Sequence, residues 1–206
     1  MRAEELLDIS FAMLASSQKE IDQLAGRTRT KALEYWLQCE LTTTLLNYCG
    51  PQYREVVTEW YIPKVVAESP IADGECDILL IHQAPTNSLR ELYDSRQLID
   101  GVYIELKTSV HNDFSPTPQR ADILKKLLRD YRRINNIKAH SHKVGLRTEA
   151  FLLALIVDAS PLEFNNRKPC LAQIAEWLNE NESLHGVQFR ELSFGNGRGL
   201  TLWVWQ

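Results

Sequence analysis

The chain has 206 residues, of which 44% are hydrophobic and 24% are charged, as in an ordinary globular protein of one domain. This composition excludes a disordered chain, and the formal net charge of -4 excludes a chain that is basic throughout, so any surface for nucleic acid has to be local. The four cysteines lack Cys-x-x-Cys spacing, which argues against a zinc site and predicts reduced thiols.

Two segments indicate where in the cell the protein is expected. The first residues, Met1–Leu7, are acidic and lack the basic and then apolar layout of a signal peptide. The longest apolar run, Phe151–Val157, is too short to span a bilayer. We therefore expect a cytoplasmic protein that does not contact a membrane.

Helical spacing of apolar residues over 3–25 predicts an accessory helical hairpin, which Gly26 ends. A second helix is expected from Thr28 or Thr30 to Tyr48. Glu34 falls inside its apolar stripe on a helical wheel. A single acid in such a stripe is more often a first-turn residue that reaches solvent, so Glu34 alone does not define a site. The stripe consists of leucines at four-residue steps: Leu33, Leu37, Leu41 and Leu45.

Two strands follow. Residues 53–63 carry the β-branched and aromatic content of a strand, and Glu59 within it is expected to face solvent. Residues 75–81 form the second strand, whose one interior charge is Asp77. An aspartate at the start of an apolar strand is usually a turn residue. Residues 82–100 are predicted to be a loop with a short helix at about 88–93.

The segment 101–109 reads as a strand that follows a turn-like Asp-Gly pair. Tyr103, Glu105 and Lys107 share one face of it, because residues two apart in a strand point the same way. An acid and a lysine in a buried strand are costly without a metal or a charged partner, but an isolated Glu-x-Lys is more often a cross-strand salt bridge. Because consecutive strands tend to be neighbours, Asp77 and Glu105 are expected to converge.

A helix is predicted next, over 119–136, with one apolar side and one basic side. Its charge would draw a polyanion towards the candidate acids, although a solvated helix face would look the same. His140 and His142 are interpreted as loop residues. The basic residues in and after this helix are Arg120, Lys125, Lys126, Arg129, Arg132, Arg133, Lys138, Lys143 and Arg147.

The C-terminal third is predicted to contain a central strand at 151–157, a helix at 170–179, and strands at 189–194 and 200–205 joined by a glycine-rich turn. The two tryptophans of the last strand, Trp203 and Trp205, are either an association surface or core residues. Core packing is the simpler interpretation.

Two carboxylates can hold a hard cation that keeps several waters, and the main-chain carbonyl of Leu106 can complete such a site. The lysine beside them can orient the attacking water and offset charge on a phosphate. At this point the chain resembles the PD-(D/E)XK nuclease superfamily, through Asp77, then Glu105-Leu106-Lys107, and the basic helix that follows. Cys76 stands where the motif has its proline. The earlier helix resembles the one that opens the nuclease domain of type I restriction subunits, with Glu34, Leu41, Leu45-Leu46 and Gly50 at matching spacing.

The resemblance implies an α/β fold: a restriction-endonuclease-like three-layer core, in which helices flank a mixed central sheet, with N-terminal accessory helices and a C-terminal β-hairpin. It covers residues 28–160 of a single domain, 1–206, and leaves 1–26 and 161–206 outside the core.

It also implies a Mg²⁺-dependent DNA endonuclease of a bacterial defence or repair kind, with Mn²⁺ as a substitute, which acts on nucleic acid and forms a homodimer. Asp77 and Glu105 would bind the metal, Lys107 would position water, and Glu34 would contact the metal or its waters. The alternatives are a catalytically inert nucleic-acid-binding or protein-interaction module, and a metal-free protein whose salt bridges mimic the motif. Contacts to the phosphate or the nucleic acid would come from Thr108, Ser109, Gln119, Lys125, Lys126 and Arg129.

Overall fold

The computed structural model of the protein describes residues 1–25, 30–49, 53–63, 74–82, 88–95, 97–110, 119–158, 187–194 and 199–206. They form a six-stranded mixed sheet with the strand order β1-β2-β3-β4-β6-β5, in which β3 and β4 are parallel and the other neighbours are antiparallel. The strands are β1 (Tyr53–Ile62), β2 (Gly74–His82), β3 (Gly101–Val110), β4 (Thr148–Asp158), β5 (Gln188–Ser193) and β6 (Gly199–Trp205). The helices are α1 (Ala3–Ser16), α2 (Gln18–Ala25), α3 (Thr30–Cys49), α5 (Leu89–Ser95) and α6 (Gln119–Lys143).

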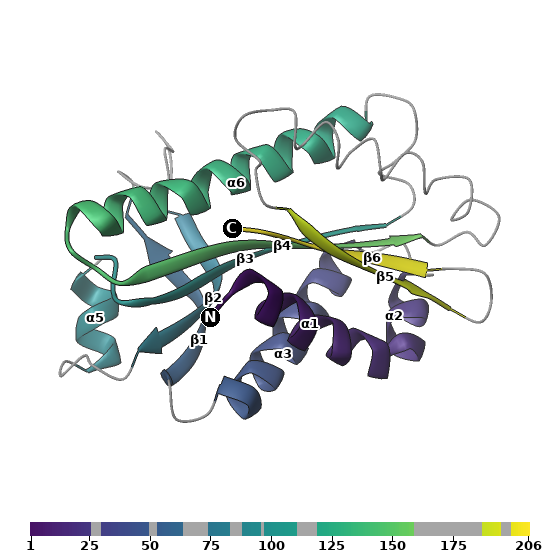
Figure 1. Cartoon of the computed structure of the whole chain (residues 1–206), viewed down its shortest axis with the longest axis horizontal. Coiled ribbons are helices and arrows are strands. Elements are labelled where there is room, and N and C mark those ends of the chain that lie inside the picture. The colour runs from purple at the N-terminus through teal and green to yellow at the C-terminus, as the bar shows by residue number, and fades with distance from the viewer. Residues whose placement is uncertain are drawn as a thin grey trace.

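Helices cover both faces of the sheet, so the protein is a mixed α/β structure. Helix α6 runs along one face, while α1, α2 and α3 lie against the other (Figure 1). The leucine stripe of α3 is fully buried on this second face, where it packs with α1 and with Ile104 and Leu106 of β3. Tyr103 instead belongs to the core beneath α6. The alternation predicted for β3 is therefore confirmed.

The helical segment expected at the N-terminus is present as two consecutive helices, α1 and α2, which Ser17 separates. Helix α1 packs on α3 and also on β5 and β6, so it forms part of the main core. Strand β4 lies between β3 and β6, and its residues 151–157 are all buried, which confirms the prediction of a central strand. Gly101 opens β3 beside β2, where a Cβ atom would lie only 2.5 Å from the carbonyl oxygen of Leu80. Only glycine permits this close approach.

Helix α6 is longer than predicted, because it continues to Lys143. The loop assignment of His140 and His142 was therefore wrong: both lie in its last turn. The reason is that the buried stripe continues at Ile137 and Ser141, beyond the last hydrophobic residue that the pattern suggested. The helix ends just before Gly145, whose φ of 77° suits a residue that follows a helix.

The two tryptophans of β6 are core residues. Trp203 is 2% exposed and Trp205 is 1% exposed, and the centroids of their stacked rings are 6.0 Å apart. The two side chains therefore do not form a surface for association. The helix predicted at 170–179 and the glycine-rich turn at 195–198 lie outside the described residues. Within the residues that are described, no helix is both long enough and apolar enough to cross a membrane.

Candidate metal and catalytic site

The site lies at a notch in the sheet between β2 and β3. The two strands pair only where Ile78–Ile81 lie opposite Gly101–Ile104, and the earlier residues of β2 pair with β1 alone. Strand β3 continues beside β4 as far as Val110. Its backbone N–H groups that point away from β4 therefore lose their strand partner beyond Ile104. They must be satisfied in another way, because buried backbone donors are almost always paired.

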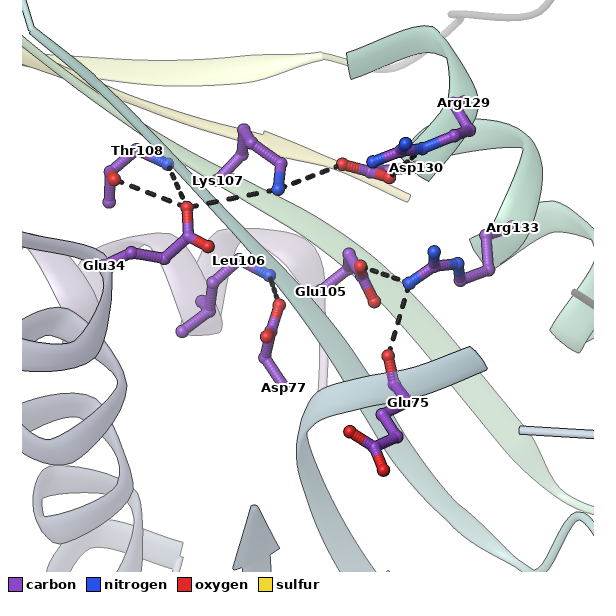
Figure 2. Close-up of polar contacts among 10 residues, drawn as sticks. All are labelled: Glu34, Glu75, Asp77, Glu105, Leu106, Lys107, Thr108, Arg129, Asp130 and Arg133. Atoms are coloured by element: carbon purple, nitrogen blue, oxygen red, sulfur yellow. Dashed lines mark hydrogen bonds and ion pairs between the residues drawn. The ribbon is translucent and has the colours of Figure 1, made fainter. Parts of the chain in front are cut away.

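Two carboxylates satisfy these donors (Figure 2). Asp77 Oδ2 accepts a hydrogen bond from the N–H of Leu106 at 2.6 Å. Glu34 Oε2, which comes from α3, accepts the N–H of Thr108 at 3.2 Å and its hydroxyl at 3.4 Å. Gln38 fixes the distance between α3 and β2, because its side-chain amide donates to the carbonyl oxygen of Asp77 at 2.8 Å. The acids predicted on α3 and β2 thus meet at the edge of β3.

Glu105 and Lys107 project from β3 towards α6, where each meets an opposite charge. The Lys107 ammonium lies 3.3 Å from Asp130 Oδ2 and 4.0 Å from Glu34 Oε2. The Arg133 guanidinium donates to Glu105 Oε1 and also to the main-chain carbonyl of Glu75 at 3.2 Å. The structure therefore brings all four predicted residues, Glu34, Asp77, Glu105 and Lys107, to the same end of the notch, where each has its own polar partners (Figure 2).

The sequence analysis missed Asp130 and Arg133, whose side chains are two of these partners. A signal for Asp130 existed: it lies three residues after Leu127 and four before Ile134, which places it on the buried stripe of α6. Its side chain is completely buried. Arg133 was counted among the basic residues that would draw a polyanion, and no spacing rule shows which strand residue it would meet.

Burial perturbs the acids of the notch. Desolvation raises the pKa of Glu105 to about 8, although Arg133 opposes this shift. Desolvation also raises the pKa of Asp77 to about 6, against the hydrogen bond from Leu106, and the charge of Glu34 adds to the increase. For Lys107, desolvation lowers the pKa, but Asp130 and then Glu34 outweigh it, so the pKa lies above the ordinary value. The ammonium is therefore held in its charged form.

The fit of a divalent cation can be judged from the donors. Among the described residues, no group of three or more His, Cys, Asp or Glu side chains already surrounds a position for a metal. The available donors nevertheless suit Mg²⁺, which prefers oxygen ligands and keeps several waters. Glu105 Oε2 is buried and has no hydrogen-bond partner in the described part of the chain. The Leu106 carbonyl points towards the notch like its N–H, since both groups of a strand residue point to the same side.

A cavity of about 150 Å³ adjoins the site on the side of α3. Glu59 is exposed, as predicted, but it also lines this cavity, and its backbone has the left-handed φ of 54°. The lining residues are Lys31, Glu34, Tyr35, Gln38, Glu59 and Asp77.

The residues expected to contact a phosphate or nucleic acid differ in their exposure to solvent. Thr108 and Ser109 are 3% and 1% exposed, and Thr108 is engaged by Glu34. Lys126 and Arg129 are exposed on α6. Gln119 and Lys125 belong to the same helix, but their side chains lie outside the described part of the structure.

The raised pKa of Asp77 predicts a pH dependence of stability in EDTA. In the unfolded chain this group ionises near its ordinary value of 3.8, and in the folded protein near 6, so the folded state holds more protons between these values. Stability should therefore fall as the pH rises through this window. The shift corresponds to about 3 kcal/mol at 1.36 kcal/mol per pKa unit.

Urea unfolding at pH 4 and pH 7 tests this expectation. The wild type should lose about 2–3 kcal/mol more than Asp77→Asn, because asparagine keeps an oxygen for the Leu106 N–H and does not ionise. The charge of Asp77 also helps to raise the pKa of Glu105, so its removal in Asp77→Asn adds to the difference in the same direction. Parallel pH profiles of the two proteins would contradict the raised pKa of Asp77.

Comparison with known proteins adds no family to this geometry, so the function is inferred from the site itself. No family model matches the chain, and neither a curated protein nor a solved structure matches it.

Proposed function

We propose that this protein is a cytoplasmic nuclease that depends on a divalent metal and hydrolyses phosphodiester bonds, with DNA as the favoured substrate. The observation that carries the proposal is the position of Asp77 and Glu105, which both lie at the notch beside Lys107. Both acids have raised pKa values, and one Glu105 oxygen is buried without a hydrogen bond in the described structure. Two desolvated carboxylates of this kind are stabilised by a cation, and such sites are typical of active centres.

The proposed ligands are Asp77, Glu105 and the main-chain carbonyl of Leu106, which would bind Mg²⁺ or, as a substitute, Mn²⁺. A cation bound there would supply Lewis acidity towards the phosphate and lower the pKa of a bound water. Lys107 would orient the attacking water and offset negative charge on the phosphate. Asp130 and Glu34 hold the Lys107 ammonium from two sides, and Glu34 would contact the metal or its waters.

The exposed charges of α6 supply a path for the substrate. Lys126, Arg129 and Arg132 are exposed on the helix that also carries Asp130 and Arg133. In a chain with a net charge of -4, this local concentration favours a polyanion at the site. The restriction-endonuclease-like form of the α/β fold, a role in bacterial defence or repair, and a homodimer complete the proposal.

A second candidate function is a catalytically inert nucleic-acid-binding module. It is favoured by the observation that Arg133 pairs with Glu105 and Asp130 pairs with Lys107. These ion pairs could stabilise the fold without any metal. The two candidates differ in what the metal does, because an inert module keeps its affinity for DNA in EDTA and cuts nothing.

A cleavage assay distinguishes them. The purified protein is incubated with plasmid DNA, linear duplex, single-stranded DNA and RNA, each with Mg²⁺, Mn²⁺ or EDTA. The proposal predicts cutting that requires the metal, and the substrate that is cut gives the class. Cleavage that continues in EDTA would contradict it. Binding of DNA without cleavage under every condition would favour the inert module.

A further inference from the structure

Arg133 bridges the notch at its mouth. Its Nη1 atom donates both to Glu105 on β3 and to the main-chain carbonyl of Glu75, which lies on β2 two residues before Asp77. One guanidinium therefore links the two strands where they separate (Figure 2). It also occupies one oxygen of the acid that the proposed function assigns to the metal.

A divalent cation and Arg133 are competitors for this acid. The Glu105 side chain is only 7% exposed, so charges around it are weakly screened. A dication between Asp77 and Glu105 would be repelled by the guanidinium, and it would neutralise the carboxylate that holds the guanidinium in place. Arg133 holds Oε1 and a metal would take Oε2, so the two cations are expected to oppose one another at Glu105 through their charges.

The surrounding structure allows the side chain to move without the helix. The backbone of α6 is anchored on both sides of Arg133 by Ile134 and Ile137, which are buried, and by the ion pair between Asp130 and Lys107. The Arg133 side chain is 19% exposed, so it reaches the surface of the protein. Its long side chain can rotate towards solvent, where a guanidinium binds phosphate well.

We propose that Arg133 is an internal placeholder for the metal: it holds the Glu105 carboxylate until a divalent cation binds, and then turns outwards to face an anionic substrate. This inference rests on the proposed function, because it requires the metal to bind at Glu105. Arg133 is then a positioning residue. When the metal binds, the Arg133 guanidinium becomes available to an anionic substrate.

Chemical labelling of arginine tests the inference directly. The full-length protein is treated with phenylglyoxal in EDTA or with Mn²⁺, and peptide mass spectrometry gives the extent of modification at each arginine. Modification of Arg133 should increase severalfold with Mn²⁺. Arg132, the exposed neighbour on α6, is the matched internal control and should not change.

Two variants show whether the metal itself or the charge of Glu105 controls the labelling of Arg133. Asp77→Asn removes a proposed metal ligand but keeps the contact between Arg133 and Glu105, so Arg133 should stay unreactive with and without Mn²⁺. Glu105→Gln removes the charge that holds Arg133, so Arg133 should be reactive in both conditions. The thermal shift of the wild type with Mn²⁺ is recorded in parallel. Metal binding with unchanged labelling of Arg133 would overturn the placeholder alone, whereas no metal binding would overturn the proposed function as well.

Discussion

Replacing Lys107 with methionine is expected to lower the metal-dependent cleavage rate by about 10²–10⁴-fold, the usual contribution of a side chain that orients or deprotonates the nucleophile. Methionine keeps most of the aliphatic volume beside α6 and removes only the ammonium, which lies between Asp130 and Glu34. The loss should appear in the rate at saturating metal, since Lys107 is not a proposed ligand. Initial rates on the substrate that the wild type cuts give the measurement.

Lys143→Met is the matched control for this variant. Lys143 is an exposed lysine in the last turn of α6, so its loss removes the same charge away from the notch. Its cleavage rate should stay close to that of the wild type. If Lys107→Met cut as fast as Lys143→Met, the activity would belong to another site or to a contaminant.

Replacing Asp130 with alanine is expected to destabilise the protein by about 2–4 kcal/mol. The Asp130 carboxylate is completely buried, and its loss leaves the Lys107 ammonium with one ion pair in the described part of the chain, to Glu34 at 4.0 Å. Breaking a fully buried ion pair costs about 3–5 kcal/mol, and the lower range here reflects the 18% exposure of the Lys107 side chain. Urea unfolding in EDTA gives the free energy.

A double variant shows whether the pair is the cause. Lys107→Met combined with Asp130→Ala removes both charges, so the double variant should lose less free energy of unfolding than the sum of the losses in the two single variants. Cleavage by the double variant should stay as slow as that of Lys107→Met, because stability is recovered without the ammonium. Additive single effects would mean that Asp130 and Lys107 do not stabilise each other.

Most helices and strands were predictable from the local hydrophobic pattern, because the folded structure buries the residues that the pattern marks. The leucine stripe of α3 and the alternation along β3 were both predicted, because α3 buries one face of its helical period and alternate residues of β3 enter the two cores on either side of the sheet. The end of α6 was not, since the decisive residue is Ser141, a small polar residue that is buried by packing against the rest of the fold. A hydrophobicity pattern does not register such a position.

Some residues of the candidate site were also predictable from the sequence, and others were not. Glu34, Asp77, Glu105 and Lys107 were noticed because charges interrupt apolar stretches, and the resemblance to the nuclease superfamily joined them into one expected site. Asp130 interrupts the stripe of α6 in the same manner, but it stands between basic residues that suggested a solvated face. The partnership of Arg133 with Glu105 depends on how α6 crosses the sheet, and a single sequence does not contain that angle.

The central claim is that Asp77 and Glu105 together bind a divalent metal, and a calorimetric titration of Mn²⁺ into the purified protein tests it most directly. The account predicts saturable binding by the wild type, loss of that binding in Asp77→Asn and Glu105→Gln, and its retention in Lys143→Met. Binding that is absent from the wild type, or that survives unchanged in Asp77→Asn, would contradict the claim.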